Sequence, residues 1–146
     1  MELKDVLHKD LVFLDVDIES DEEAFEFVGK KALELGLVED TFAASLVERE
    51  REFPTGLLVG ETGVTISHTD PEHIVEEFVS LVRPNNPVTF KLIDQPDQDV
   101  AVELIFVLGL KKAVNQLECL KAIMALLEDK EKLKEMLESK DLSSLF

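Results

Sequence analysis

The order of helix-like and strand-like segments along the chain predicts a layered α/β domain with a mixed sheet. Helical periodicity dominates the first part of the sequence, strand-like runs fill the middle, and helical periodicity returns at the end. Among the strand-like runs, Val100–Leu108 is almost continuously apolar, which is typical of a central strand buried on both faces. No internal repeat or Gly/Ser/Pro-rich linker divides the chain, so we expect residues 1–146 to form one domain.

The first elements are a short strand and two helices. The apolar, β-rich run Leu11–Asp17 predicts the strand. Ser20 and Glu23 have the spacing of a capping box that starts a helix, and Gly36 is placed to end it. Asp40 is expected to cap a second helix that ends near residue 52.

The remaining elements follow from the same periodicities. Strands are expected at Leu57–Val59, Val64–Ser67, Glu77–Val82 and Val88–Ile93, with a turn at Pro84–Pro87. A long helix is expected from the spacing of four apolar residues, Leu117, Leu120, Met124 and Leu127. Residues 129–138 predict a charged amphipathic helix with three apolar side chains inside, Leu133, Met136 and Leu137.

The charge balance excludes several classes of partner. The 146 residues contain 15 Lys and Arg against 32 Asp and Glu, which gives a net charge of −17. Because such a surface repels phosphate backbones and anionic lipid, we expect no binding to nucleic acid or to membrane surfaces. The single cysteine, Cys119, cannot form an internal disulfide, and the first residues do not resemble a signal peptide. These features predict a cytoplasmic protein.

His68 has the most informative position among the three histidines. Strand alternation puts it at the end of a strand, on the same side as Val64. Asp70 and Pro71 suit the N-cap and first position of a helical turn, whose free N–H groups favour an anion. Such a place suits a histidine that carries a phosphoryl group, whereas the alternative is an ordinary polar loop histidine. A third interpretation is a metal site formed by His68, Asp70 and His73, but the spacing matches no strong zinc pattern.

Arg49 interrupts the apolar stripe of the second predicted helix. The stripe includes Phe42 and Leu46, and Phe53 continues it after Arg49. A guanidinium in this place either lies half-buried and binds a carboxylate or phosphate, or reaches towards solvent or the helix C-terminus. The neighbouring charges, Glu48 and Glu50–Glu52, are interpreted as a solvated run.

Two further polar side chains are candidates for a site. The Thr55 hydroxyl is able to donate a hydrogen bond to a phosphoryl oxygen, or Thr55 is only a turn residue. The Gln116 amide is able to hydrogen-bond an imidazole or a phosphate, or it faces water. Cys119 lies among apolar neighbours and is interpreted as an inert core thiol. Since no Gly-rich phosphate loop and no Ser/His/Asp triad is found, the sequence predicts no cofactor.

Together these residues resemble a known family. The segments Arg49–Gly56 and Gly63–His68, followed by a second histidine at position 73, look like the fructose/mannitol-type IIA domain of the bacterial phosphotransferase system. The galactitol-type IIA protein is the subgroup that they resemble most. Later segments also agree, namely Leu81–Pro84, Asp99–Val102 and Leu117–Leu120. The resemblance extends over roughly residues 10–140.

The resemblance implies a fold, a reaction and a set of partners. The fold would be a three-layer α/β/α sandwich with a mixed central sheet. His68 would accept a phosphoryl group from the phosphocarrier HPr and pass it to a cysteine of a separate IIB protein. The IIB protein would then phosphorylate a sugar or polyol, for example galactitol, as the membrane IIC protein imports it. Arg49 would neutralise the phosphoryl charge, and Thr55 would help to hold the group.

The chain departs from the family pattern at two positions. Ser67 stands where the family usually has proline directly before the phosphorylated histidine. Gln116 stands where fructose- and mannitol-type members usually carry a second histidine, a change that the galactitol subgroup shares. Either His73 or Gln116 would orient the His68 ring, and the spacing leaves both open.

The surroundings of His68 are expected to bind a partner protein, and a second function is possible for the same site. Transfer of a phosphoryl group shielded from water needs an apolar rim around His68, for which Phe53, Leu57 and Ile74 are the candidates. The acidic surface would attract basic patches on a partner. The alternative function is that of an IIA-like regulatory phospho-sensor without a dedicated transporter.

Overall fold

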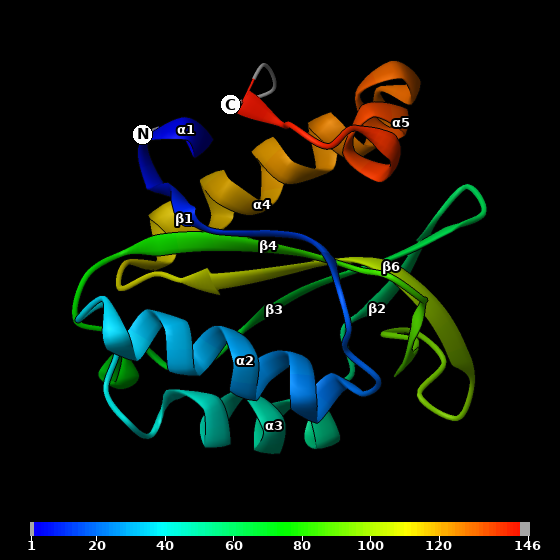
Figure 1. Cartoon of the computed structure of the whole chain (residues 1–146). Coiled ribbons are helices and arrows are strands. Elements are labelled where there is room, and N and C mark those ends of the chain that lie inside the picture. The colour runs from blue at the N-terminus through cyan, green and yellow to red at the C-terminus, as the bar shows by residue number, and fades with distance from the viewer. Residues whose placement is uncertain (1, 144–146) are drawn as a thin grey trace.

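A six-stranded mixed sheet separates two layers of helices in the computed structural model, which describes residues 2–143 (Figure 1). The strands are β1 (Leu7–Val16), β2 (Gly56–Val59), β3 (Thr62–His68), β4 (Phe78–Pro84), β5 (Val88–Lys91) and β6 (Asp99–Gly109). The helices are α1 (Leu3–Val6), α2 (Asp21–Glu34), α3 (Phe42–Glu52), α4 (Ala113–Glu128) and α5 (Lys130–Glu138), with a 3₁₀ turn, η1, at Pro71–His73. Helices α2 and α3 cover one face, and α1, α4 and α5 lie on the other (Figure 1). The expected three-layer sandwich is therefore confirmed.

The sheet is mixed because parallel and antiparallel pairs alternate across it. Its order is β1-β4-β6-β3-β2, and β5 pairs with the first half of β6. Strand β1 runs parallel to β4, and β3 runs parallel to β6, whereas the other pairs are antiparallel. Since β3 and β6 are parallel, their carboxyl ends meet at one edge of the sheet, where His68 pairs with Leu108. This edge holds the candidate site.

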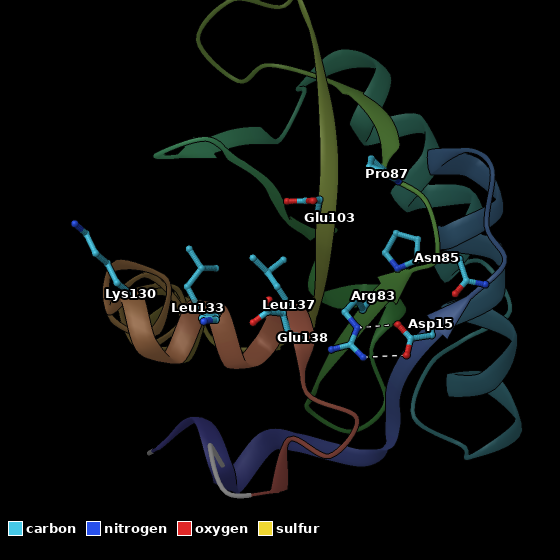
Figure 2. Close-up of a pocket in the computed structure, with 11 residues that line it drawn as sticks. Asp15, Arg83, Asn85, Pro87, Glu103, Lys130, Leu133, Leu137 and Glu138 are labelled. Atoms are coloured by element: carbon cyan, nitrogen blue, oxygen red, sulfur yellow. Dashed lines mark hydrogen bonds and ion pairs between the residues drawn. The ribbon is translucent and has the colours of Figure 1, made fainter.

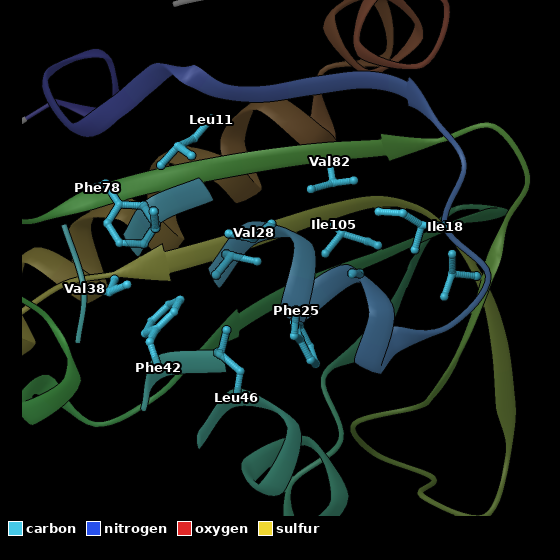
Figure 3. Close-up of a cluster of buried hydrophobic side chains, with 14 of the residues drawn as sticks. Leu11, Ile18, Phe25, Val28, Val38, Phe42, Leu46, Phe78, Val82 and Ile105 are labelled. Carbon is cyan, nitrogen blue, oxygen red and sulfur yellow. The ribbon is translucent and has the colours of Figure 1, made fainter. Parts of the chain in front are cut away.

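Each face of the sheet packs on its own apolar core. Figure 3 shows the core between the sheet and helices α2 and α3, to which Phe25, Phe42 and Phe78 contribute large rings. The core on the opposite face includes Val64 and Ile66 of β3 and is covered mainly by α4. The alternation predicted for β3 is thereby confirmed. Full burial of one such side chain contributes roughly 1.5–3 kcal/mol.

Most of the predicted elements are found at the expected places, and the start of α3 is the exception. Ser20 accepts the predicted capping bond from the Glu23 N–H, and Gly36 follows α2 with a φ of 75°. Asp40, however, is not the N-cap of α3: Thr41 is, and its side chain makes no capping bond. The Glu39 carbonyl accepts a hydrogen bond from the Phe42 N–H. A backbone turn, and not the Asp40 side chain, therefore provides an acceptor at the start of α3.

The predicted long helix is confirmed as α4, and only part of its apolar spacing lies in the core. Leu117 and Leu120 are 50% and 39% exposed, whereas the buried stripe consists of Cys119, Ile123 and Leu127. Helix α4 is apolar on more than one face, so its periodicity alone does not identify the buried one. The expected core position of Cys119 is confirmed, and burial raises the pKa of its thiol to about 11. Among residues 2–143, no helix has the length and apolar content needed to cross a bilayer.

The edge of the sheet away from His68 is held by a buried arginine. Arg83, at the end of β4, donates from Nε and Nη2 to the Asp15 carboxylate at 3.1 and 3.0 Å (Figure 2). Its Nη1 donates to the carbonyls of Met136 and Ser139 at 2.9 and 2.6 Å. Asp15 has a φ of 59°, a backbone region that Asp tolerates better than most residues. Arg83 therefore ties β1 and the end of α5 to the sheet, beside a cavity of about 510 Å³.

Replacing Arg83 should destabilise the fold. The change Arg83→Met leaves the buried carbonyl of Met136 and the part-buried carbonyl of Ser139 without their donor, which should cost about 2 kcal/mol. Urea unfolding measures the loss. The control is Lys91→Met, which removes an exposed ion pair with Asp99 and should cost less than about 1 kcal/mol. Equal losses in the two variants would contradict the assigned role of Arg83.

Candidate functional site

A cavity of about 440 Å³ at the shared edge of β3 and β6 brings together four of the five candidate site residues. Arg49, Thr55, His68 and Gln116 all line it. Each comes from a different element: the last turn of α3, the turn before β2, the end of β3 and the first turn of α4. The chain thus supplies a cation, a hydroxyl, an imidazole and an amide to one place from segments that are far apart in sequence.

His73 is the candidate that the fold directs elsewhere. The 3₁₀ turn after His68 carries it to the α3 side, where its Nδ1 lies 2.7 Å from the Thr41 hydroxyl oxygen. It lines a second cavity, of about 390 Å³, which Arg49 also borders. Of the two possible neighbours of the His68 ring, Gln116 therefore shares its cavity and His73 does not. Within residues 2–143, no three His, Cys, Asp or Glu side chains are grouped so as to hold a metal ion.

His68 is surrounded in a way that favours its neutral form. Burial is the main reason why the pKa of His68 lies below its usual 6.5. The nearby Arg49 guanidinium lowers the pKa further, and Asp70 offsets part of the effect. A neutral imidazole at pH 7 keeps one ring nitrogen with a free lone pair, which makes it a nucleophile.

Arg49 is half-buried and lies against an aromatic ring. Its guanidinium carbon is 5.3 Å from the centroid of the Phe53 ring, a cation–π contact. Among the described residues, no carboxylate lies within 4.0 Å of Arg49. Of the two arrangements considered for Arg49, the half-buried one is observed, and its charge borders the cavity rather than an acidic partner.

The apolar rim of the cavity differs in part from the predicted one. Phe53 and Leu57 line the cavity as expected, but Ile74 is 5% exposed and belongs to the core beneath α2 and α3. Phe53 was also expected to continue the buried stripe of α3, yet it is 58% exposed. The helix ends at Glu52, and the non-helical backbone of Phe53 takes its side chain off the helical face. The exposed Ile93 and Leu120 complete the rim.

Glu50 is the site residue that sequence reasoning missed. It was assigned to a solvated charge run, but only 6% of it is exposed. Its carboxylate accepts the Thr55 N–H at 2.9 Å and the Thr55 hydroxyl at 2.6 Å. The spacing of four residues from Phe42 to Leu46 to Glu50 is the signal that identifies it, because all three share the buried face of α3.

The Glu50 carboxyl titrates near neutral pH and controls the Thr55 hydroxyl. Burial raises the pKa of Glu50 to about 7, although both hydrogen bonds from Thr55 oppose the rise. The Thr55 oxygen also contacts the hydroxyls of Thr65 and Ser67, the latter at 3.2 Å. The Thr55 proton is therefore directed to Glu50 here, rather than into the cavity as the sequence suggested.

Removal of the Arg49 charge should raise the pKa of His68. In Arg49→Gln the imidazolium of His68 no longer faces a neighbouring cation, while the burial of the ring remains. An NMR titration of the His68 ring measures the change. The control is Arg51→Gln, which removes an exposed arginine that pairs with Glu22 and should leave the titration unchanged. A shift of equal size in both variants would mean that Arg49 does not act specifically on His68.

The buried Glu50 carboxyl should make the fold less stable as the pH rises. Its pKa is about 4.5 in the unfolded chain and about 7 in the folded one, so the unfolded state releases the proton first. Stability is then lost between these pH values. Glu50→Gln removes the loss, and its advantage over the wild type should grow from near zero at pH 4.5 to on the order of 3 kcal/mol above pH 7. Denaturant unfolding at several pH values measures it, and a constant difference would contradict the assignment.

Comparisons with known proteins agree with this fold. A family model described as the EIIA 2 component of the phosphoenolpyruvate-dependent sugar phosphotransferase system matches residues 5–146. The galactitol-specific EIIA component of Escherichia coli K12 is 34% identical over 106 residues, which are 73% of this chain and 70% of that protein.

Solved structures share the fold at lower identity. The mannitol enzyme IIA of Escherichia coli, in its complex with phosphorylated enzyme IIB, matches with a TM-score of 0.76 and 16% identity, over 95% of this chain and 93% of the other. The nitrogen regulatory IIA protein of Neisseria meningitidis matches with a TM-score of 0.72 and 22% identity, over 97% and 94%. These structures support the architecture, and the family model together with the galactitol-specific relative supports the family. The chain therefore belongs to the EIIA type 2 family of the phosphoenolpyruvate-dependent sugar phosphotransferase system.

Proposed function

We propose that this chain carries a phosphoryl group on His68, which it accepts from phospho-HPr and passes to a cysteine of a IIB protein. The observation that supports this most is the pairing in one cavity of a neutral, half-buried imidazole with an arginine that has no carboxylate within 4.0 Å among the described residues. Phosphoryl transfer needs a positioned nucleophile and stabilisation of charge more than covalent machinery. Both are present at this edge of the sheet.

The free lone pair of the His68 ring attacks phosphorus as the bond to the donor histidine of HPr breaks. Arg49 offsets the negative charge of the phosphoryl oxygens, and Gln116 orients the ring through its amide. Thr55 maintains the shape of the cavity. His73 lies outside the cavity and takes no part in the reaction. The phosphoryl group leaves by the same in-line route when the IIB cysteine attacks it.

The rim of the cavity fits a transient protein partner. Exposed apolar side chains surround the opening, and Phe53, Ile93 and Leu120 are 58%, 54% and 39% exposed. They exclude water from the phosphoryl group while the two proteins are in contact. The net charge of −17 attracts basic patches on the partner and speeds association.

The biological role that we propose is a part in sugar or polyol uptake. The protein acts in the cytoplasm, and residues 1–146 form one IIA domain. The relative named as a galactitol-specific EIIA component favours a galactitol-like substrate for the membrane IIC protein that the IIB partner serves. A regulatory phospho-sensor would use the same His68 chemistry. The relative that is 34% identical is named as a component of a galactitol-specific phosphotransferase system, which favours transport.

Phosphorylation by phosphoenolpyruvate, Enzyme I and HPr tests the site. The wild type and His73→Ala should take up an acid-labile, base-stable phosphate, and His68→Ala should take up none. Addition of a IIB protein should then remove the label from the wild type. A label that persists in His68→Ala but is lost in His73→Ala would place the acceptor at His73. An unlabelled wild type beside charged HPr would refute the carrier function.

A further inference from the structure

The carboxyl of Glu50 lowers the stability of the fold, and the transfer mechanism does not use it. It is almost fully buried, and its ionised form lowers the stability of the fold above pH 4.5, as described above. A neutral glutamine would fill nearly the same volume. Buried groups that cost stability are found preferentially at functional sites, where they shape the chemistry of a neighbour.

A chain of hydroxyl groups connects Glu50 to the strand that ends in His68. Thr55 bonds to Glu50 through its N–H and its hydroxyl, and its oxygen contacts the hydroxyls of Thr65 and Ser67. The hydroxyls of Thr65 and Ser67 are 3.1 Å apart and buried. Glu50 directly follows Arg49, and Ser67 directly precedes His68. This chain of hydroxyl groups thus begins beside Arg49, the cation of the site, and ends beside His68, its nucleophile.

The ionisation state of Glu50 determines the direction of these hydrogen bonds. An ionised carboxylate only accepts, so both the N–H and the hydroxyl of Thr55 must donate to it. The Thr55 oxygen is then left to accept from the hydroxyls of Thr65 and Ser67, and all protons point towards Glu50. A protonated Glu50 is itself a donor, and this order is lost. Hydrogen bonds to a charged acceptor are also shorter and stronger than neutral ones.

We propose that Glu50 is a positioning residue for phosphoryl transfer, whose ionised carboxylate fixes the end of α3 and Thr55 against β3 and thereby sets Arg49 relative to His68. This inference rests on the function proposed above. It assigns no contact between Glu50 and the phosphoryl group, because the hydroxyl chain lies on the face of β3 opposite to His68.

Burial and the charges around Glu50 together place the pKa of its carboxyl in the physiological range. Burial raises its pKa most, and Asp21 at the start of α2 raises it further. From the β2–β3 side it meets the Thr55 N–H and uncharged hydroxyls. On its own helix Arg49 points to the cavity and Arg51 pairs with Glu22. Positioning by Glu50 should therefore be half complete near pH 7, complete well above it and absent well below it.

The rate of phosphoryl transfer from phospho-HPr, measured between pH 5.5 and pH 8.5, tests the role of Glu50. Glu50→Gln should match the wild type at pH 5.5 and be about tenfold slower at pH 8.5, the factor that corresponds to about 1.4 kcal/mol. The loss should lie in the maximal rate and not in the KM for phospho-HPr, since Glu50 is buried away from the partner. Because Glu50→Gln is expected to be the more stable protein at pH 8, unfolding does not explain a slower reaction.

Matched variants separate positioning from a general charge effect. Glu34→Gln removes one exposed carboxylate at the end of α2 and should leave the rate unchanged. Thr55→Ser keeps the hydroxyl and should retain most of the rate, whereas Thr55→Val should lose it. Adding Glu50→Gln to Thr55→Val should then slow transfer little further, because the two residues act through one link.

The outcomes distinguish this inference from the proposed function. A Glu50→Gln protein as fast as the wild type at pH 8.5, together with an inactive His68→Ala, would overturn the inference alone. An unlabelled wild type would refute the function. In that case NMR still tests the link: the amide signal of Ser67 and the Nε–H signal of Arg49 should titrate with Glu50 and lose this titration in Glu50→Gln. Signals that are identical in both proteins would overturn the inference independently.

Discussion

The parallel pairing of β3 with β6 creates the place in which Arg49, Thr55, His68 and Gln116 meet. It brings the ends of two strands to one edge of the sheet, with His68 beside Leu108 and with α4 starting just beyond β6. Gly63 makes this pairing possible, because a Cβ at that position would overlap the carbonyl oxygen of Ala101. The side chains of α3 and α4 then approach His68 from the two faces of the sheet.

The two arginines Arg83 and Arg49 differ in what surrounds their guanidinium groups. Arg83 is enclosed and uses its donors on Asp15 and on two carbonyls, so it has little left to offer a ligand. Arg49 is half-buried against the Phe53 ring and borders two cavities. Among residues 2–143 no carboxylate pairs with Arg49, and its charge adds to the larger effect of burial in lowering the pKa of His68.

The site also shows a balance between stability and reactivity. Its edge exposes apolar side chains, lowers the pKa of a histidine and buries a carboxyl whose pKa is about 7. The exposed apolar side chains oppose the stability of the fold, the buried carboxyl does so above pH 4.5, and the lowered pKa of the histidine does so only in acid; the two apolar cores on either face of the sheet compensate for these effects. Arg83 fixes the end of the sheet that lies away from His68. A sheet fixed in this way is able to carry such a site at its other end.

Local rules in the sequence determined the layered fold, the start and end of α2, the alternation along β3 and the position of His68 at a strand end. These features depend on residues within a few positions of one another. The tertiary structure alone decided that Glu50 is buried, that Gln116 rather than His73 shares the cavity of His68, and that α4 turns Leu117 outwards. In each case the deciding partner lies on another element, because burial and hydrogen bonding depend on what packs against a face and not on the periodicity that creates it.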